Sequence, residues 1–506
     1  MSEVDKPFEI PEHWNWARLS DFAEVNPRFQ RDNLAEDTEV SFVPMKRVEE
    51  LSGQMDPSET KPLGEVRKGY TYFENGDVLF AKITPCMENG KVAVARGLQN
   101  GVGFGSTEFH VIRHPDKTTQ DWIFYYLIQE GFRRDAKRAM TGSAGQKRVP
   151  TRYIEETLIP LPPLPEQRRI VAKIEELFSN LDAGMGELSV AEQQLKRYRL
   201  SVLQAAVEGR LTADWRRTHD PEPADQLLER ILEERRAQWE ERYRWKRYDS
   251  KGKKPPSGWK DRYKEPESPD TEDLSAPPEG WIWITLEQLG EWTGGNTPRR
   301  SNDAYWEAGT IPWVSPKDMK SEEITDTKDY MTELALQEAN ASQVGDGSLL
   351  FVTRSGILRH TLPVAIARVQ VTINQDLKAL QLTPSVNSDY LLRWAQGKNQ
   401  AIRLDCMKHG TTVQSIKSKA LYRYPVPLPP LAEQKQIVAE VERLLSVADD
   451  ASATTKQEQT RAERLRQSIL KQAFSGKLVP HEAEHSAPET PPTPAARVGE
   501  QMEMGL

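Results

Sequence analysis

The segment IPLPPLPEQRRIVAKIEELF at residues 159–178 returns as VPLPPLAEQKQIVAEVERLL at residues 426–445, an offset of 267 residues (426 minus 159). The same offset aligns PEHWNWARLSDFAE, from Pro11, with PEGWIWITLEQLGE, from Pro278, and it aligns RYRLSVLQAAVEGRLT with RLRQSILKQAFSGKLV. Self-similarity at a fixed period indicates architecture more strongly than any local feature. The sequence therefore predicts two copies of one unit, each a variable domain followed by a helix.

Four prolines between residues 160 and 165 precede the long helix of the first copy. Proline fits neither a helix interior nor a central strand, so we expect an extended segment that ends where the helix begins, at Glu166. Apolar or small residues then recur at spacings of four and three as far as about Val207. This pattern is typical of a coiled coil and predicts a rod of about 60 Å.

Each long helix needs a partner for its apolar seam, and the nearest one is the helix of the other copy. Two copies in one chain can pair antiparallel with approximate twofold symmetry. Packing of each helix inside an ordinary domain is the alternative. The residues predicted to pair are Ile170, Ile174, Leu177, Leu181 and Leu195 in the first helix and Ile437, Val441, Leu444, Leu465 and Ile469 in the second.

Both variable domains show the patterns of a mixed α/β domain. YFENGDVLFAKI (72–83) and GDGSLLFVTRSG (345–356) each combine a turn signal with an apolar strand. TTQDWIFYYLIQEGFRRDAKRAM (118–140) and NSDYLLRWAQGKNQAIRLDCM (387–407) have helical periodicity and correspond in position. The predicted class is α+β, with two mixed α/β domains joined by two long antiparallel coiled-coil helices in an internal pseudo-twofold repeat.

The repeat and its surroundings predict six segments. They are a first variable domain at 1–158, a spacer helix at 159–212, a charged helical insert and linker at 213–277, a second variable domain at 278–425, a second spacer helix at 426–480 and a disordered tail at 481–506. The insert contains an expected helix around Leu227 to Arg244. Its cations either contact DNA or a partner subunit, or belong to a solvated arm; they are Arg235, Arg236, Arg242, Arg244, Lys246 and Arg247.

The composition is that of a globular protein with several domains. The chain has 506 residues, 37% of them hydrophobic, no run of eighteen apolar residues, and an acidic beginning, MSEVDKPFEIPEHW. Cys86 and Cys406 are too few for a disulfide framework or a four-cysteine metal site. We therefore expect a cytoplasmic protein with two reduced cysteines and no metal.

Net charge and local charge point in different directions. A formal charge of -8 argues mildly against a nucleic-acid partner, because phosphate binding normally requires excess Lys and Arg. In RRDAKRAMTGSAGQKRVPTR (133–152), however, seven cations accompany one acid, Asp135. This segment either grips a phosphate backbone or is a solvated helix face that continues into a loop.

Catalytic motifs are missing from the sequence. It has no G-x-x-x-x-G-K-[ST] loop, no G-x-S-x-G elbow, no dinucleotide fingerprint and no NPPY- or DPPY-like segment. HEAEH at 481–485 fits a zinc pattern, but the proline-rich sequence after it cannot form the supporting helix. These absences disfavour catalysis by this chain.

The duplicated PLPPLPEQ and PLPPLAEQ blocks, the helices behind them and the closing VEGRL and FSGKL resemble those of specificity subunits of type I restriction-modification systems, over roughly residues 8–480. The resemblance implies two target-recognition domains, each binding one half of a split sequence in double-stranded DNA. It also implies that the helices set the spacer and dock two modification (methyltransferase) subunits, and that this chain reads DNA without catalysis of its own. S-adenosylmethionine, ATP and Mg are then expected on partner subunits, which include a translocating and cleaving restriction subunit.

Reading of guanine requires Arg or Lys, and reading of adenine Asn or Gln, on loops or helix starts that reach the major groove. The candidates in the first domain are Lys46, Arg47, Lys82, Asn89, Lys91, Gln146, Lys147 and Arg148. Those in the second are Asn296, Arg299, Arg300, Lys317, Arg354, Arg359, Asn374, Gln375, Gln414 and Lys417. For each residue the alternative is loop solvation or an internal hydrogen bond, and TINQDLKAL (372–380) in particular has the pattern of a half-buried segment.

The sequence leaves two functions open besides the reading of DNA. One is a coiled-coil scaffold whose two domains bind proteins, in which case the basic segment at 133–152 is incidental. The other is a nuclease or methyltransferase, which the missing cofactor loops disfavour. Genes for an adenine methyltransferase and a helicase-like nuclease beside this one would separate these alternatives from the DNA-reading function.

Overall fold

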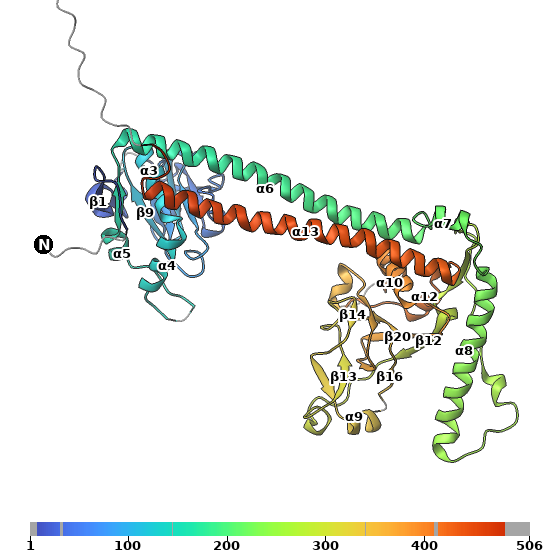
Figure 1. Ribbon diagram of the computed structural model, residues 1–506. Helices are drawn as coiled ribbons and strands as arrows, with labels where there is room; N and C mark the ends of the chain where they lie inside the picture. The colour runs from blue at the N-terminus through green and yellow to red at the C-terminus, as the bar shows by residue number, and fades with distance from the viewer. Residues whose placement is uncertain (1–7, 31–33, 144, 340, 409–412, 481–506) are drawn as a thin grey trace, which may run out of the picture. The chain divides into compact units, whose positions relative to one another are not determined.

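The computed structural model describes residues 8–30, 34–143, 145–339, 341–408 and 413–480 (Figure 1). The predicted disordered tail and its HEAEH motif lie outside these residues. The chain forms two compact units, one within residues 1–189 and 456–506 and the other within 190–455. In the described part, no helix is both long and apolar enough to cross a membrane.

The first variable domain contains two four-stranded sheets. One has the order β4 (Thr60–Pro62), β3 (Glu39–Val43), β8 (Val102–Gly105), β5 (Thr71–Glu74), in which only β3 and β8 are parallel. The other has the antiparallel order β2 (Glu24–Val25), β9 (Phe109–Arg113), β6 (Val78–Ala81), β7 (Val92–Val94). All four residues of β6 are buried, which confirms the strand that the apolar run VLFA predicts.

The second variable domain contains a five-stranded and a four-stranded sheet. The first has the order β12 (Gly290–Gly294), β20 (Leu377–Leu382), β17 (Leu349–Val352), β18 (Val364–Ala367), β14 (Glu323–Ile324). The second has the order β15 (Asp329–Met331), β13 (Ile311–Val314), β19 (Val371–Ile373), β16 (Gln343–Val344). β17 is the strand predicted within 345–356, and it is also buried along its whole length.

A two-stranded ladder holds the two ends of each domain together. β1 (Asn15–Arg18) pairs antiparallel with β10 (Leu158–Leu161), and β11 (Ile282–Thr285) pairs antiparallel with β21 (Pro425–Leu428). The proline-rich segments thus supply edge strands, where a missing N–H is tolerated. α6 (Leu164–Val207) begins two residues before the predicted start and includes Pro165. Proline fits this first turn because the N–H groups there have no partner within the helix.

The first turn of each long helix forms a buried junction with the domain that precedes it. The Trp14 indole donates a hydrogen bond to the Glu166 carboxylate (3.1 Å), and the Trp281 indole donates to Glu433 (2.8 Å). The glutamine after each glutamate donates a 2.9 Å bond to a prolyl carbonyl five residues earlier. We call each Trp–Glu pair the junction of its copy.

The two junctions differ in the basic side chain that lies beside the glutamate. Glu433 is fully buried and accepts hydrogen bonds from the Thr212 hydroxyl (2.6 Å) and from Arg216 (2.8 and 3.0 Å). Glu166 lies instead 2.8 Å from Nε2 of His13, whose side chain is 46% exposed. The second junction is therefore the more deeply buried of the two, and its glutamate and arginine form an ion pair.

Each stretch predicted to form one helix after the sheets forms two. Residues 118–140 give α3 (Lys117–Leu127) and α4 (Glu130–Ala139), and residues 387–407 give α10 (Ser388–Gly397) and α11 (Asn399–Cys406). At the second break, a Cβ on Gly397 would lie 3.0 Å from the carbonyl oxygen of Leu203 in α6. The close approach of α6 favours glycine there, and periodicity alone gave no sign of it.

The two long helices, α6 and α13 (Leu431–Phe474), pack together antiparallel, as predicted (Figure 1). In the first unit, buried residues between 170 and 178 share a core with residues 469–474. In the second unit, buried residues between 202 and 207 share a core with Ile437 and Val441. Of the predicted seam, Ile170, Ile174, Ile437, Val441 and Ile469 are buried, Leu177, Leu181, Leu195 and Leu444 are half-buried, and Leu465 is 47% exposed.

The charged insert forms α8 (Ala224–Arg247), which packs on the second variable domain. Leu227 and Ile231 are fully buried in the core of that unit. Arg235 is also buried, and its Nε donates to the carbonyl oxygens of Glu287 (2.9 Å) and Gly290 (3.1 Å). Of the six cations named in the insert, Arg235 is therefore a structural residue of the second domain.

Candidate nucleic-acid interface

Polar side chains gather in the first domain where the central strand β6 ends. The residues after this strand lie against the loop between α4 and α5 (Thr151–Glu156). Val149 N donates to Lys82 O (2.9 Å), and Thr84 N donates to Lys147 O (3.1 Å). We call segments 82–84 and 146–149 the loop pair of the first domain.

The second domain has a loop pair at the equivalent place. After β17, Ile416 N donates to Thr353 O (2.8 Å), and Ser355 N donates to Gln414 O (3.1 Å). Segments 353–355 and 414–416 form this second loop pair, which precedes α12 (Ser418–Tyr422) as the first precedes α5. Val149 and Ile416 are 267 residues apart, so the backbone arrangement is repeated although the side chains differ.

The first loop pair brings four of the predicted residues together with one acid. Arg148 donates to Glu108 through Nε (2.8 Å) and Nη2 (2.7 Å), and this bond lowers the pKa of the Glu108 carboxyl. Burial lowers the pKa of the nearby Lys82 ammonium. Lys147 and Gln146 are exposed. Glu108 was not among the predicted residues, because it is 40 residues from Arg148 and no local pattern connects the two.

The seven cations of segment 133–152 are less free than the sequence suggested. Lys137 pairs with Glu88 (3.2 Å), Arg152 with Glu156 (2.8 Å), and Arg148 with Glu108. Arg134 and Arg138 lie 3.8 and 3.1 Å from Asp135, and Arg133 donates to backbone carbonyl groups. Within the described residues, Lys147 alone of the seven has no acidic or carbonyl partner for its side chain.

The other candidates of the first domain form a second group around η1 (Met45–Arg47). Lys91 Nζ donates to the carbonyl oxygens of Met45 (3.3 Å) and Val48 (3.0 Å), so it is used internally. Arg47 pairs with Asp56 and Glu59, and Asn89 donates to Glu50 (2.9 Å). Lys46 is the exposed cation of this group.

The candidates of the second domain also fall into two groups. Arg354 and Gln414 lie on the second loop pair. Lys417 follows this loop pair directly and is exposed. Arg359 and Lys317 are exposed as well. The other group, residues 296–300, lies beside β13 and β19. There Asn296 donates to the carbonyl oxygen of Ala339 (2.5 Å), and Gln375 accepts a hydrogen bond from Thr297. Arg299 is exposed. Asn374 is only 5% exposed, in agreement with the half-buried pattern of residues 372–380.

Arg300 is held in place by aromatic rings that the sequence did not connect with it. Its guanidinium lies 4.0 Å from the ring centroid of Trp306 and 4.4 Å from that of Trp313, and it donates to Asp329 (2.8 Å). Cation–π contacts and the ion pair together fix the orientation of a long side chain. A tryptophan six residues after an arginine carries no recognisable signal, so only the fold reveals this arrangement.

No metal centre accompanies these groups. Within the described residues, no cluster of three or more His, Cys, Asp or Glu side chains is placed to hold a metal ion. The sites consist of loop cations, amides and hydroxyls around strand ends. Such groups donate hydrogen bonds to phosphate oxygens and base edges.

A family model described as type I restriction modification DNA specificity domain matches residues 11–190 and 278–462, which are the two copies of the repeat. The EcoAI and EcoEI type I restriction enzyme specificity subunits of Escherichia coli are 28% and 27% identical to the chain over 510 residues, covering 89% of it and 80% of each relative. The HsdS subunit of Thermoanaerobacter tengcongensis has a similar fold (TM-score 0.53, 20% identity, 93% of this chain and 99% of that one). A solved chain described under complex assembly and conformational transition of the type I R-M system is similar over 93% of this chain and all of that one (TM-score 0.67, 20% identity).

Proposed function

The chain belongs to the family of type I restriction-modification DNA specificity subunits, and from that premise we propose that each variable domain reads one half of a bipartite DNA target. A specificity subunit is the non-catalytic part of its restriction-modification enzyme, so this chain is neither the nuclease nor the methyltransferase. Its task is to choose the DNA sequence.

The observation that carries the proposal is the repeated loop pair. The backbone pairing after β6 and after β17 is equivalent, but the first loop pair presents Lys82, Lys147 and Arg148 and the second presents Arg354 and Gln414. Two modules that read different bases need the same docking geometry with different donors and acceptors at its tip. The repeat combines these two properties.

The long helices are proposed to set the distance between the half-sites and to dock two modification subunits. Each helix has 44 residues, or about 66 Å at 1.5 Å per residue. Leu200 and Val447 are 63% and 60% exposed, and Val190, Tyr198 and Leu465 on the same two helices are also at least 40% exposed. Apolar side chains exposed on such a surface support its use as an interface.

S-adenosylmethionine, ATP and Mg are proposed to bind to the partner subunits. The modification subunits would carry the methyl donor, and restriction subunits would use ATP and Mg to translocate and cleave DNA. This division agrees with a chain whose sequence contains no cofactor loop.

The test of half-site reading is sequencing of adenine methylation in cells that carry this chain with its modification subunits. We expect a split motif. Exchanging Arg354 and Gln414 for Ala should change or abolish recognition of one half, and Lys147→Ala with Lys82→Ala should affect the other half only. A contiguous motif, or loss of both halves from one pair of substitutions, would contradict the assignment. Methylation independent of this chain would favour the protein-binding scaffold.

Docking is tested separately by co-purification. Leu200→Glu combined with Val447→Glu should lose the modification subunits while the chain melts as the parent does, because both side chains are exposed. Leu334→Glu is the matched control, since Leu334 is a 43% exposed leucine on α9 (Glu333–Glu338) of the second domain, outside the two long helices. Equal loss of partners in both variants would contradict docking on the helices.

A further inference from the structure

The insert that contains α8 has its charges sorted along the chain. Residues 224–241 carry six acids and three arginines, residues 242–264 carry ten cations and two acids, and residues 265–277 carry five acids and no Lys or Arg. A solvated face usually mixes the two signs. A block of ten cations within a chain of net charge -8 is instead typical of a surface that meets a polyanion.

This arm, residues 224–264, is a folded element. Trp239 stacks on Tyr243 with ring centroids 4.7 Å apart, and Tyr243 stacks on Trp259 of the returning segment with ring planes 3° from parallel. Tyr263 packs on Trp239 (5.2 Å), and its hydroxyl accepts from Arg235 (2.6 Å). The aromatic cluster therefore fixes the returning segment against α8, and its cations are presented by an ordered element.

Most cations of the arm have no acidic partner. Arg244 lies 3.2 Å from Asp249 and Lys260 lies 2.5 Å from Glu240. Seven others are exposed and form no ion pair within the described residues; they are Lys246, Arg247, Lys251, Lys253, Lys254, Arg262 and Lys264. Binding of an anion would thus break no existing ion pair at these positions.

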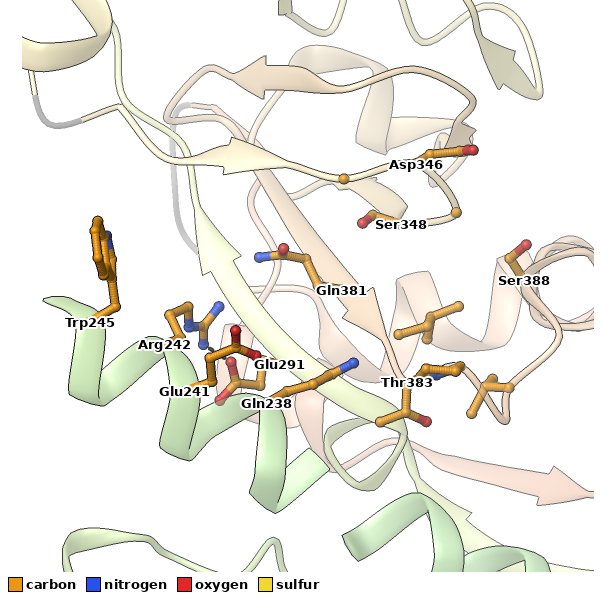
Figure 2. A pocket seen from close by; sticks show the side chains of 15 residues that line it. Gln238, Glu241, Arg242, Trp245, Glu291, Asp346, Ser348, Gln381, Thr383 and Ser388 are labelled. Atoms are coloured by element: carbon orange, nitrogen blue, oxygen red, sulfur yellow. Dashed lines mark ion pairs between the residues drawn. The ribbon is translucent and has the colours of Figure 1, made fainter. Parts of the chain in front are cut away.

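The cleft beside α8 limits where an anion can lie. Figure 2 shows this cleft, of about 640 Å³, between α8 and the strands of the second domain. Glu241, Glu291 and Asp346 line it, and Arg242 is paired with Glu291. Trp245, 63% exposed, stands at its edge on the last turns of α8. The acids disfavour phosphate inside the cleft, so the available cations are those of residues 246–264.

We propose that residues 246–264 bind the phosphate backbone of double-stranded DNA without regard to sequence. The proposal rests on the proposed function, in which the second domain reads bases. Phosphate contacts release counterions and position a protein on the duplex, but they carry no sequence information. An ordered arm loses less conformational freedom on binding than a flexible tether. DNA is favoured over an acidic protein surface because the chain belongs to a DNA specificity family.

The test uses the full chain co-purified with its modification subunits, and two duplexes, one carrying the methylated motif and one of scrambled sequence. K251Q/K253Q/K254Q should lower the slope of log K against log salt by up to about 2.7 on both duplexes, since each lost phosphate contact contributes about 0.9. The preference for the motif should stay at the parent value. K251R/K253R/K254R, which keeps the charge, should bind as the parent does.

The matched control is K68Q/K328Q/K419Q, which removes the same charge from three exposed lysines outside the arm. An equal fall in slope for this control would show an effect of net charge and overturn the proposal. An unchanged slope in the arm variant, with loss of the modification subunits, would identify an acidic protein surface as the occupant. If the parent protein showed no preference for the motif but the arm variant still had a reduced salt slope, the proposed reading of bases would be refuted. The proposal that the arm binds DNA would then stand by itself.

Discussion

At the scale of single residues, tertiary partners decide which cations remain available. Arg148 and Lys147 are neighbours in the sequence, but Arg148 is held by two bonds to Glu108 and Lys147 has no such partner in the described residues. An arginine already neutralised by a carboxylate releases fewer counterions when it meets a phosphate. The two residues should therefore contribute unequally to DNA binding.

Lys147→Ala should lower the salt slope of DNA binding by about 0.9, and Arg148→Ala should lower it by clearly less. Glu108→Gln should raise DNA affinity, because it frees the charge of Arg148. Salt titrations of the three variants with the modification complex measure these effects. Equal slopes for the parent and Lys147→Ala would remove Lys147 from the interface.

The two junctions allow a comparison within one chain. Glu433→Ala leaves the Arg216 guanidinium without its buried carboxylate, and such a loss should cost about 3 kcal/mol. Glu166→Ala should cost less, about 1 to 2 kcal/mol, because the His13 side chain at that junction is 46% exposed and can be hydrated, whereas Arg216 is only 19% exposed. Hydrogen exchange followed separately in each unit is the measurement, since a chain of two units need not unfold in one step. A larger effect in the first unit would contradict the comparison.

At the scale of elements, long periodic patterns were predictable and their interruptions were not. The seam of α6, the strands β6 and β17 and the helix α8 follow from hydrophobic period and composition. The break between α10 and α11 follows Gly397, whose close approach to the Leu203 carbonyl group of α6 is a tertiary contact that no local sequence pattern encodes. Leu465 fits the heptad pattern but is 47% exposed, whereas Ile469, Leu470, Ala473 and Phe474 in the last turns of α13 lie in the core of the first unit.

The candidate site was predictable only in part, for the same reason. Lys82, Gln146, Lys147 and Arg148 were named from residue type and lie on one loop pair, and Arg354 and Gln414 lie on the other. Lys91 and Arg235 have the same chemistry in the sequence but donate to backbone carbonyls. Residue type indicates what a side chain can donate to, and only the fold indicates whether that capacity is already used.

The helix pairing predicts opposite outcomes for two apolar positions. Ile174→Asp places a charge in a fully buried site and should destabilise the first unit by more than about 3 kcal/mol, with loss of the modification subunits. Leu465→Asp should cost less than about 1 kcal/mol, because Leu465 is largely exposed. Thermal melts and co-purification of both variants check this. An Ile174→Asp chain that melts like the parent would contradict the pairing.

At the scale of the whole molecule, the duplication is proposed to act as a ruler. One heptad added between Leu188 and Leu195, with another between Thr455 and Ala462, keeps the seam in register and lengthens each helix by about 10 Å. The half-sites should then move apart by at most about three base pairs, within the limits set by the twist of about 35° per pair. The bases read in each half should stay the same.

Adenine methylation in cells that carry the lengthened chain and its modification subunits measures the new spacer. A single insertion in α6 alone serves as the control, because it shifts one seam against the other and should abolish activity. The original spacer at full activity would refute the ruler. A changed half-site sequence would show that the helices take part in reading bases.

The ladders β1–β10 and β11–β21 have a consequence for heredity. Asn15 lies opposite Leu161, and Ile282 lies opposite Leu428. The residues between the two members of each pair therefore form one closed loop of the chain. The entropic cost of closing a loop grows only with the logarithm of its length. Recombination on both sides of such a loop can therefore replace it with one of different length while the ladder and the long helix behind it persist, and under the proposed function this exchange would change one half of the target.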